Sequence, residues 1–220
     1  MTWRATTMPA LTGLILLGCI SLHVAPADAI DDTALGALAE LEPSFQAFVN
    51  TPLAGANPAQ SLDNLEREMA RLLELRDRYV DQLARFSSTH FAWLIMLRIA
   101  EMHLDLAARA RALPAPVDAT ADNRAAYFEI TEVYAVPLED VGLNVLRQIE
   151  AVGGALDPQS PWVQRARFYL GLHAGDEYPG LRRDLQQLRA DVTREPRFGP
   201  PRSLLDPGRL APRAARLFAE

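Results

Sequence analysis

Hydrophobic side chains recur along most of this chain at the spacing of an α-helix. Within 61–86, for example, apolar residues return every three or four positions and charged residues fill the places between them. Stretches rich in Pro, Gly, Asn and Ser interrupt this pattern, and no apolar run alternates with a period of two, so no strand is expected. The pattern predicts an all-α fold with seven helices, at 32–49, 61–86, 90–113, 122–135, 138–155, 161–173 and 179–193.

Two of the expected helices carry a well-defined apolar face. The first would bury Leu35, Leu38, Leu41, Phe45 and Phe48. The second would bury Leu62, Leu65, Met69, Leu72, Leu73, Tyr79, Val80, Leu83 and Phe86. The third, 90–113, is apolar nearly all round in its first half, which is typical of a helix buried between neighbours.

Proline and serine mark the expected helix ends. Ser61 is predicted to be the N-cap of the second helix, and Ser160 with Pro161 the N-cap and first residue of the sixth. Proline lacks a backbone donor and clashes with the preceding turn, so Pro43 is expected to kink or split the first helix. Pro137 either kinks one long helix or separates two.

The first 29 residues have the three parts of a secretory signal peptide. Arg4 supplies a positive charge, an apolar run covers 10–22, and Ala27-Asp28-Ala29 ends the segment with small residues. The run is short for a bilayer span, which needs roughly 20 residues. The segment therefore predicts export from the cytoplasm, with the mature chain in the periplasm.

A lipoprotein signal is the alternative interpretation of the same segment. Leu16-Leu17-Gly18-Cys19 resembles a bacterial lipobox, in which Cys19 would become the lipidated first residue and a membrane tether. An uncleaved anchor is a third alternative, and all three place the domain outside the cytoplasm.

The rest of the chain divides into two parts. Residues 30–194 are expected to form one helical, repeat-like domain. From 195 to 220 the sequence becomes rich in Pro and Arg, which predicts a tail lying on the helices or in solvent, with a short last helix at 213–218.

Charge and composition exclude several functions. The formal net charge is −6, so there is no positive excess for nucleic-acid binding. All 22 basic residues are Arg, which excludes a Lys nucleophile and a phosphate-binding loop that needs Lys. A single Cys excludes an intramolecular disulfide and any zinc or iron–sulfur site built from several cysteines.

The spacing of aromatic residues is similar to that of tetratricopeptide repeats. Trp93 and Tyr127 are 34 residues apart, as are Phe128 and Trp162, and 34 residues is the tetratricopeptide period. Residues 162–178 resemble the first helix and turn of such a repeat. The resemblance implies that Leu170-Gly171 is the point of close helix packing, Gly175-Asp176 the turn and Tyr178 the start of the second helix. Arg182 or Arg183 stands near the place where the family pattern has a small residue, which is a departure from the pattern. The expected fold is therefore a set of antiparallel, tetratricopeptide-like helical hairpins, with an irregular helical bundle as the alternative.

A wider stretch, 93–170, resembles helical-repeat proteins from the envelope of myxobacteria and their relatives. The shared features are an aromatic- and Ala-rich helix, a break at Leu113-Pro114-Ala115-Pro116, an aromatic-rich helix, Pro137-Leu138-Glu139 and Trp162-Val163. The resemblance implies a non-enzymatic scaffold in the periplasm, near a motility or secretion assembly.

Candidate reactive groups are scattered, and each has a structural explanation. Glu101 and Asp105 are spaced at i,i+4 with Arg98 and Arg109 around them, which predicts a solvated ion-pair face. The acidic pairs Glu129/Glu132 and Glu139/Asp140 have no defined cleft. His90, His103 and His173 are expected to be exposed or to cap helices. No metal-binding, nucleotide-binding or hydrolase motif is present, so no enzyme activity, cofactor or metal is expected.

The sequence therefore predicts a scaffold or adaptor that binds another envelope protein in a groove between helices. Aromatic and polar residues near the repeat-like segment are the expected contacts, namely Arg124, Tyr127, Glu129, Tyr134, Arg165, Tyr169 and Tyr178. Two alternatives stay open. One is an outer-membrane lipoprotein with a structural role. The other is an envelope enzyme or small-ligand carrier, which a polar cluster pointing into the helical core would favour.

Overall fold

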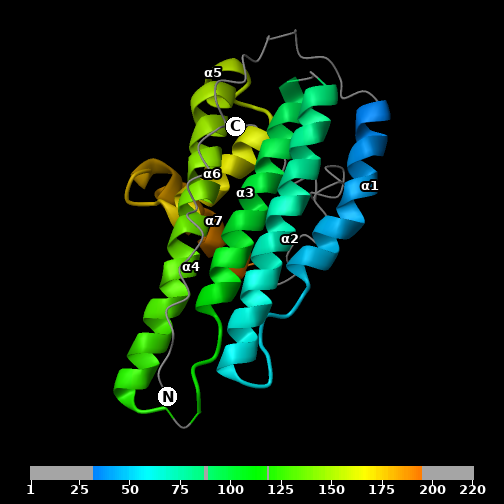
Figure 1. Ribbon diagram of the computed structural model, residues 1–220. Helices are drawn as coiled ribbons and strands as arrows, with labels where there is room; N and C mark the ends of the chain where they lie inside the picture. The colour runs from blue at the N-terminus through cyan, green and yellow to red at the C-terminus, as the bar shows by residue number, and fades with distance from the viewer. Residues whose placement is uncertain (1–31, 87–88, 118, 195–220) are drawn as a thin grey trace.

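The computed structural model describes residues 32–86, 89–117 and 119–194, and every regular element in these ranges is helical (Figure 1). The all-α prediction is confirmed. The long helices are α1 (Asp32–Val49), α2 (Pro58–Arg85), α3 (Thr89–Arg111), α4 (Ala121–Gln148), α6 (Pro161–His173) and α7 (Pro179–Arg194). The predicted signal peptide, Cys19 and the 195–220 tail with its 213–218 helix lie outside these ranges.

Helix α3 is the centre of the molecule. It packs against α1, α2, α4 and α6, and residues 91–104 are buried without interruption. Trp93 and Phe91 are among its fully buried side chains. An apolar helix surrounded on every side was the expectation for this segment, and the burial pattern confirms it.

Helix α1 covers one flank of α3 and continues through Pro43 as a single element. Four of its five predicted core residues, Leu38, Leu41, Phe45 and Phe48, are buried. Leu35 is 41% exposed, so its assignment to the core was wrong.

The N-terminus of α2 lies one turn earlier than predicted. Asn57, not Ser61, is the N-cap, since its Oδ1 accepts a hydrogen bond from the Gln60 amide (2.9 Å), and Pro58 occupies the first helical position. Ser61 is buried inside the helix, where its Oγ accepts a hydrogen bond from the Gly55 amide (2.9 Å). Ser61 therefore binds the preceding loop from inside α2, and from the sequence alone such a serine has the pattern of an N-cap.

The apolar stripe of α2 is wider than the surface it buries. Leu65, Leu72 and Tyr79 are buried, but Leu73 and Val80 are exposed although both were assigned to the core. These two residues lie on the edge of the stripe that α1 and α3 leave uncovered.

The two helices predicted on either side of Pro137 form one helix, α4. Pro137 is exposed, so its missing backbone donor and its ring are on the solvent side and the helix continues. A π-helical turn, η1 (Ile149–Gly153), and a short α5 (Gly154–Leu156) prolong α4 before α6 begins. Ser160 is the N-cap of α6 and Pro161 its first residue, as predicted, although the Ser160 side chain makes no capping hydrogen bond.

Three glycines allow helices to approach closely. A Cβ at Gly142 in α4 would lie 2.8 Å from Leu104 Cγ of α3, and one at Gly153 would lie 2.6 Å from Val163 Cγ2 of α6. A Cβ at Gly171 would lie 3.0 Å from the Leu181 backbone, so Gly171 brings α6 and α7 together at the predicted point.

The helices differ greatly in length, which is typical of an irregular bundle. Helices α2 and α4 each have 28 residues, whereas a 34-residue repeat must hold two helices and their turns. Helices α6 and α7, with 13 and 16 residues, have the size of a repeat hairpin. The tetratricopeptide assignment stays a prediction, and it concerns this hairpin above all.

Candidate partner-binding surface

The N-terminal half of α4 extends beyond the helices that cover its C-terminal half (Figure 1). Helix α6 reaches α4 at Glu139 through His173 (3.7 Å), and it reaches η1 at Glu150 through Arg167 (2.7 Å). Before Pro137, α4 lies chiefly on α3, with one bond from Tyr134 Oη to Glu66 of α2 (2.9 Å). This half of the helix therefore keeps a broad face in solvent.

Apolar side chains gather on that solvent face. Ile130, Val133 and Val136 are 39%, 54% and 46% exposed on this face, whereas Phe128, 47% exposed, lies on a different side of the helix, about 200° around the axis from Ile130. Four of the large apolar residues that the structure describes as exposed thus lie within nine positions of one helix. Three of them share one face, and we call these residues, Ile130, Val133 and Val136, the α4 ridge.

The geometry of the α4 ridge is that of a helix-packing surface. Ile130, Val133 and Val136 follow at steps of three, and such rows fit into the grooves of a neighbouring helix. The opposite side of α4 carries Tyr127 and Thr131, which are buried. Helix α4 is therefore apolar on two sides, one covered by α3 and one open.

The charge around the α4 ridge is strongly acidic. Between 121 and 146 the helix carries five acidic residues and a single basic one, Arg124. Glu132 and Glu139 bind Arg111 of α3, at 3.0 and 2.6 Å. Asp122, Glu129 and Asp140 are exposed. A partner that matches this surface would combine apolar and basic side chains.

The predicted contact residues on α4 have different environments. Glu129 is exposed beside the α4 ridge, whereas Arg124 is exposed on the other side of the helix, where it donates to the Val117 carbonyl oxygen (3.4 Å). Tyr134 is half-buried, and its hydroxyl donates a hydrogen bond to Glu66. Tyr127 is only 5% exposed, and burial raises the pKa of its hydroxyl. Most of the Tyr127 side chain is thus unavailable to a partner.

The predicted contacts on α6 point into the molecule. Arg165 Nε donates to Glu101 Oε1 of α3 (3.0 Å), and the Tyr169 hydroxyl donates to the same oxygen (3.0 Å). Arg165 also donates to the Tyr169 hydroxyl (2.9 Å). Tyr178, half-buried before α7, packs against the core. The structure therefore brings Arg165 and Tyr169 together, but into an internal network and not onto the α4 surface.

This network corrects the prediction of a solvated ion-pair face at Glu101. Arg98 is 0% exposed, and it binds Glu101 Oε2 (2.8 Å) and Glu42 Oε2 of α1 (3.0 Å). Glu101 is buried as well. The pattern predicted the pairing of Arg98 with Glu101, but the neighbouring helices enclose this part of α3. The Asp105–Arg109 pair of the same pattern also forms (2.7 Å), and it is partly exposed.

The buried network is balanced in charge. Two arginines, Arg98 and Arg165, face two carboxylates, Glu42 and Glu101, and the Arg98 guanidinium lies 4.4 Å from the ring centroid of Phe45. Burial and the Glu101 charge raise the pKa of Tyr169 well above its usual range, so its hydroxyl stays a donor. The arrangement connects α1, α3 and α6.

His103 is a second polar group that the structure places inside. It was expected to be exposed or capping, but it is buried, and its Nδ1 lies 2.8 Å from the Ile99 carbonyl oxygen. Burial lowers the pKa of His103 to about 4, so the ring is neutral at pH 7 and donates that bond. The bond gives the buried ring N–H an acceptor within α3.

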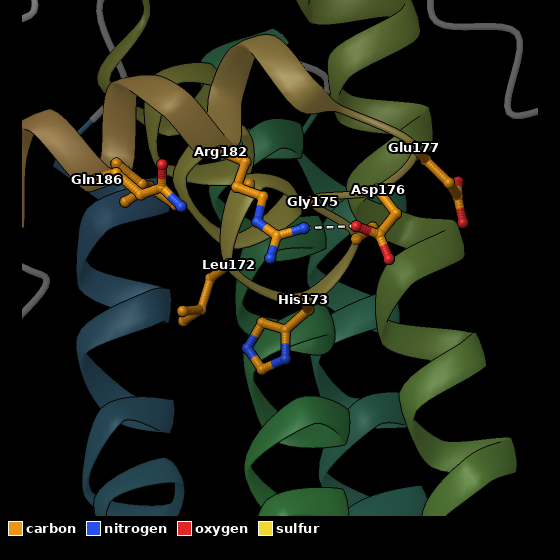
Figure 2. A pocket seen from close by; sticks show the side chains of 10 residues that line it. Leu172, His173, Gly175, Asp176, Glu177, Arg182 and Gln186 are labelled. Atoms are coloured by element: carbon orange, nitrogen blue, oxygen red, sulfur yellow. Dashed lines mark hydrogen bonds and ion pairs between the residues drawn. The ribbon is translucent and has the colours of Figure 1, made fainter.

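A cavity of about 470 Å³ lies where the end of α6 meets α7 (Figure 2). Leu172, His173 and Arg182 line it, and Arg182 forms an ion pair with Asp176 across it. The neighbouring Glu177 binds Arg147 (2.8 Å). These charges already have partners, so the cavity does not present free groups that converge on a ligand.

Within the described ranges, no three His, Cys, Asp or Glu side chains are placed to hold a metal ion. Among the described helices, none has a stretch both long and apolar enough to cross a bilayer. Comparison with known proteins adds no assignment, because no family model, no curated protein and no solved structure matches this chain.

Proposed function

We propose that this protein is a non-enzymatic scaffold or adaptor that binds another protein of the bacterial cell envelope through the α4 ridge. The observation that supports this proposal best is the row of three exposed apolar side chains, Ile130, Val133 and Val136, on a helix face that no described element covers. Isolated exposed apolar residues are normal on a protein surface, whereas a contiguous row is typical of an interface. A partner helix would place its side chains between those of the ridge.

The inward polar cluster is the feature that would favour the alternative, an enzyme or a small-ligand carrier. Its bonding argues for a structural role. Both Glu101 oxygens are engaged, one by Arg98 and the other by Arg165 and Tyr169. Arg98 in turn binds Glu42. A catalytic pair needs a group that can exchange a proton with a substrate, and these groups bind one another.

The envelope location is part of the proposal and depends on residues 1–29. The resemblance to myxobacterial envelope proteins adds a role near a motility or secretion assembly. Mass spectrometry of the mature N-terminus tests the export step. A chain beginning at Ile30 supports a cleaved signal peptide and removes the lipoprotein alternative, whereas an acylated Cys19 supports a lipoprotein tethered to the membrane.

Partner binding is tested by capture from envelope extract with the full chain and two matched variants. Val133→Asp places a charge in the α4 ridge, and Leu35→Asp places one at an exposed leucine of α1. We expect Val133→Asp to lose the captured partner and Leu35→Asp to retain it, because a charge in a desolvated interface is unfavourable. Equal capture by both variants would mean that the α4 ridge is not the binding surface.

A further inference from the structure

The α4 ridge combines two properties that restrict what can cover it. Its centre is apolar, and the helix around it carries five acidic residues against two arginines, Arg124 and Arg147. An occupant must therefore present apolar side chains flanked by positive charge. We propose that this occupant is the C-terminal tail of the same chain, through its segment 209–218. This inference rests on the surface assigned under the proposed function, and it names what lies there before a partner binds.

A second copy of the protein is a poor occupant. Helix α4 has a net charge of −4 between 121 and 146, with five acidic residues and one arginine. A symmetric contact through the α4 ridge would bring two such faces together. Like charges across an interface repel and suppress that association.

The tail has the complementary chemistry. Residues 207–219 contain three arginines and no acidic residue. Within the predicted 213–218 helix, Ala214, Leu217 and Phe218 are spaced at i, i+3 and i+4, Arg213 directly precedes Ala214, and Arg216 directly precedes Leu217. Such a segment could set Leu217 and Phe218 on the apolar ridge while its arginines face Glu129 and Asp140.

The tail is long enough to reach this surface. Helix α7 ends at Arg194, and 18 residues lie between Arg194 and Arg213. An extended chain of that length spans about 60 Å, since each residue adds roughly 3.3 Å. Helix α4, with 28 residues, is about 42 Å long at 1.5 Å per residue. The reach of the tail therefore exceeds the length of the helix on which it would lie.

Occupation by the tail would make it a competitor of any partner that uses the α4 ridge. The effective concentration of a tethered segment is high, so even a weak contact would cover the surface for much of the time. A partner would then have to displace the tail, and loss of the tail would increase partner binding.

Photo-crosslinking in the full chain tests the contact directly. With p-benzoylphenylalanine in place of Val133, we expect irradiation to join the α4 ridge to peptides from 207–219 of the same chain, identified by mass spectrometry in the monomer band. Crosslinks to a second copy or to residues 1–31 would each overturn the proposal, as would the absence of any crosslinked peptide.

Hydrogen exchange supplies a measurement without an introduced probe. In the full chain, Arg213→Glu with Arg216→Glu should make the amides of 128–136 exchange severalfold faster, because the cover is lost. The matched control is Arg85→Glu with Arg183→Glu, two exposed arginines of α2 and α7, which changes the net charge equally. Equal exchange at 128–136 in the two double variants would overturn the proposal. Partner capture with Val133→Asp is read independently, so failure of the tail contact and failure of the proposed function are distinguishable.

Discussion

Arg98 is a charged residue in the middle of an apolar helix, and its environment explains how the interior tolerates it. Its guanidinium binds carboxylates from two helices, Glu42 of α1 and Glu101 of α3, and packs over the Phe45 ring. A buried ion pair adds little net stability over an apolar replacement of both partners, but removal of one partner leaves the other charge unpaired. Single-residue changes here should therefore have large effects.

We predict that Arg98→Met destabilises the protein by about 3–5 kcal/mol, because Glu42 would lose its buried counter-charge and Glu101 would keep only Arg165. Urea unfolding gives the free energy. The matched control is Arg85→Met at an exposed position of α2, expected to change stability by less than about 0.5 kcal/mol. If both variants unfold with the free energy of the wild-type protein, the network is not formed.

His103 should make stability depend on pH. Its pKa is lowered to about 4 in the folded protein, against 6.5 for the exposed ring. Between these values the unfolded chain binds more protons than the folded one, so stability rises with pH and is lost as pH falls from 6.5 toward 4. At pH 4 the titration of His103 therefore lowers the free energy of unfolding by about 3 kcal/mol relative to pH 7.

The measurement for His103 is the free energy of unfolding at several pH values between 7 and 4. His103→Gln removes the titrating ring, so its stability should fall less steeply than that of the wild-type protein over the same range. Parallel curves for the two proteins would show that His103 is not a buried neutral group.

At the scale of elements, α4 connects the interior to the open surface. Its C-terminal half lies between α3 and α6, and its N-terminal half rests mainly on α3. Gly142 allows the close approach to α3, and Pro137, on the solvent side, lets one helix run through both regions. The continuity of α4 through Pro137 and Gly142, two residues of low helix propensity, therefore depends on its packing environment more than on local propensity.

Replacement of Gly142 should distinguish the effect of helix–helix packing on stability from that of helix propensity. We predict that Gly142→Ala destabilises the protein by about 1–3 kcal/mol, because its Cβ would lie 2.8 Å from Leu104 Cγ and 3.2 Å from the Ala100 carbonyl. Gly36→Ala in α1, where nothing lies within 4 Å of the new Cβ, should instead stabilise it by about 0.5–1 kcal/mol. Thermal unfolding of both variants decides, and a gain in stability at both positions would contradict the close α3–α4 contact.

At the scale of the whole molecule, the interior and the α4 ridge should respond differently to the same substitution. The core runs from α1 through α3 to α6, whereas the ridge lies outside it. A charge on the ridge should affect binding and leave folding intact.

We predict that Val133→Asp changes the free energy of unfolding by less than about 0.5 kcal/mol, because the side chain is already largely in solvent. Ile95→Asp in α3 should cost about 4 kcal/mol or more, since it buries an unpaired charge. Circular dichroism with urea compares the two. Unfolding of Val133→Asp like that of Ile95→Asp would place Val133 in the core.

The sequence was sufficient to predict the helices and most of the buried faces, because helical periodicity is a local property that repeats every few residues. The limits of α6 and the burial of 91–104 were correct for this reason. Solvent exposure is not local in this sense. Leu35, Leu73 and Val80 have the spacing of core residues, yet no helix covers them.

Only the packing of distant helices could decide which polar groups turn inward and which apolar groups stay outside. Arg98 and Glu101 look like a surface pair along the chain, and they are buried because α1 and α6 close over α3. The sequence around Ile130 and Val133 does not distinguish them from core residues of a helix. They remain exposed to solvent because α6 ends near Glu139, before it reaches them. Local spacing determines the element, whereas the environment of each side chain depends on what arrives from elsewhere in the chain.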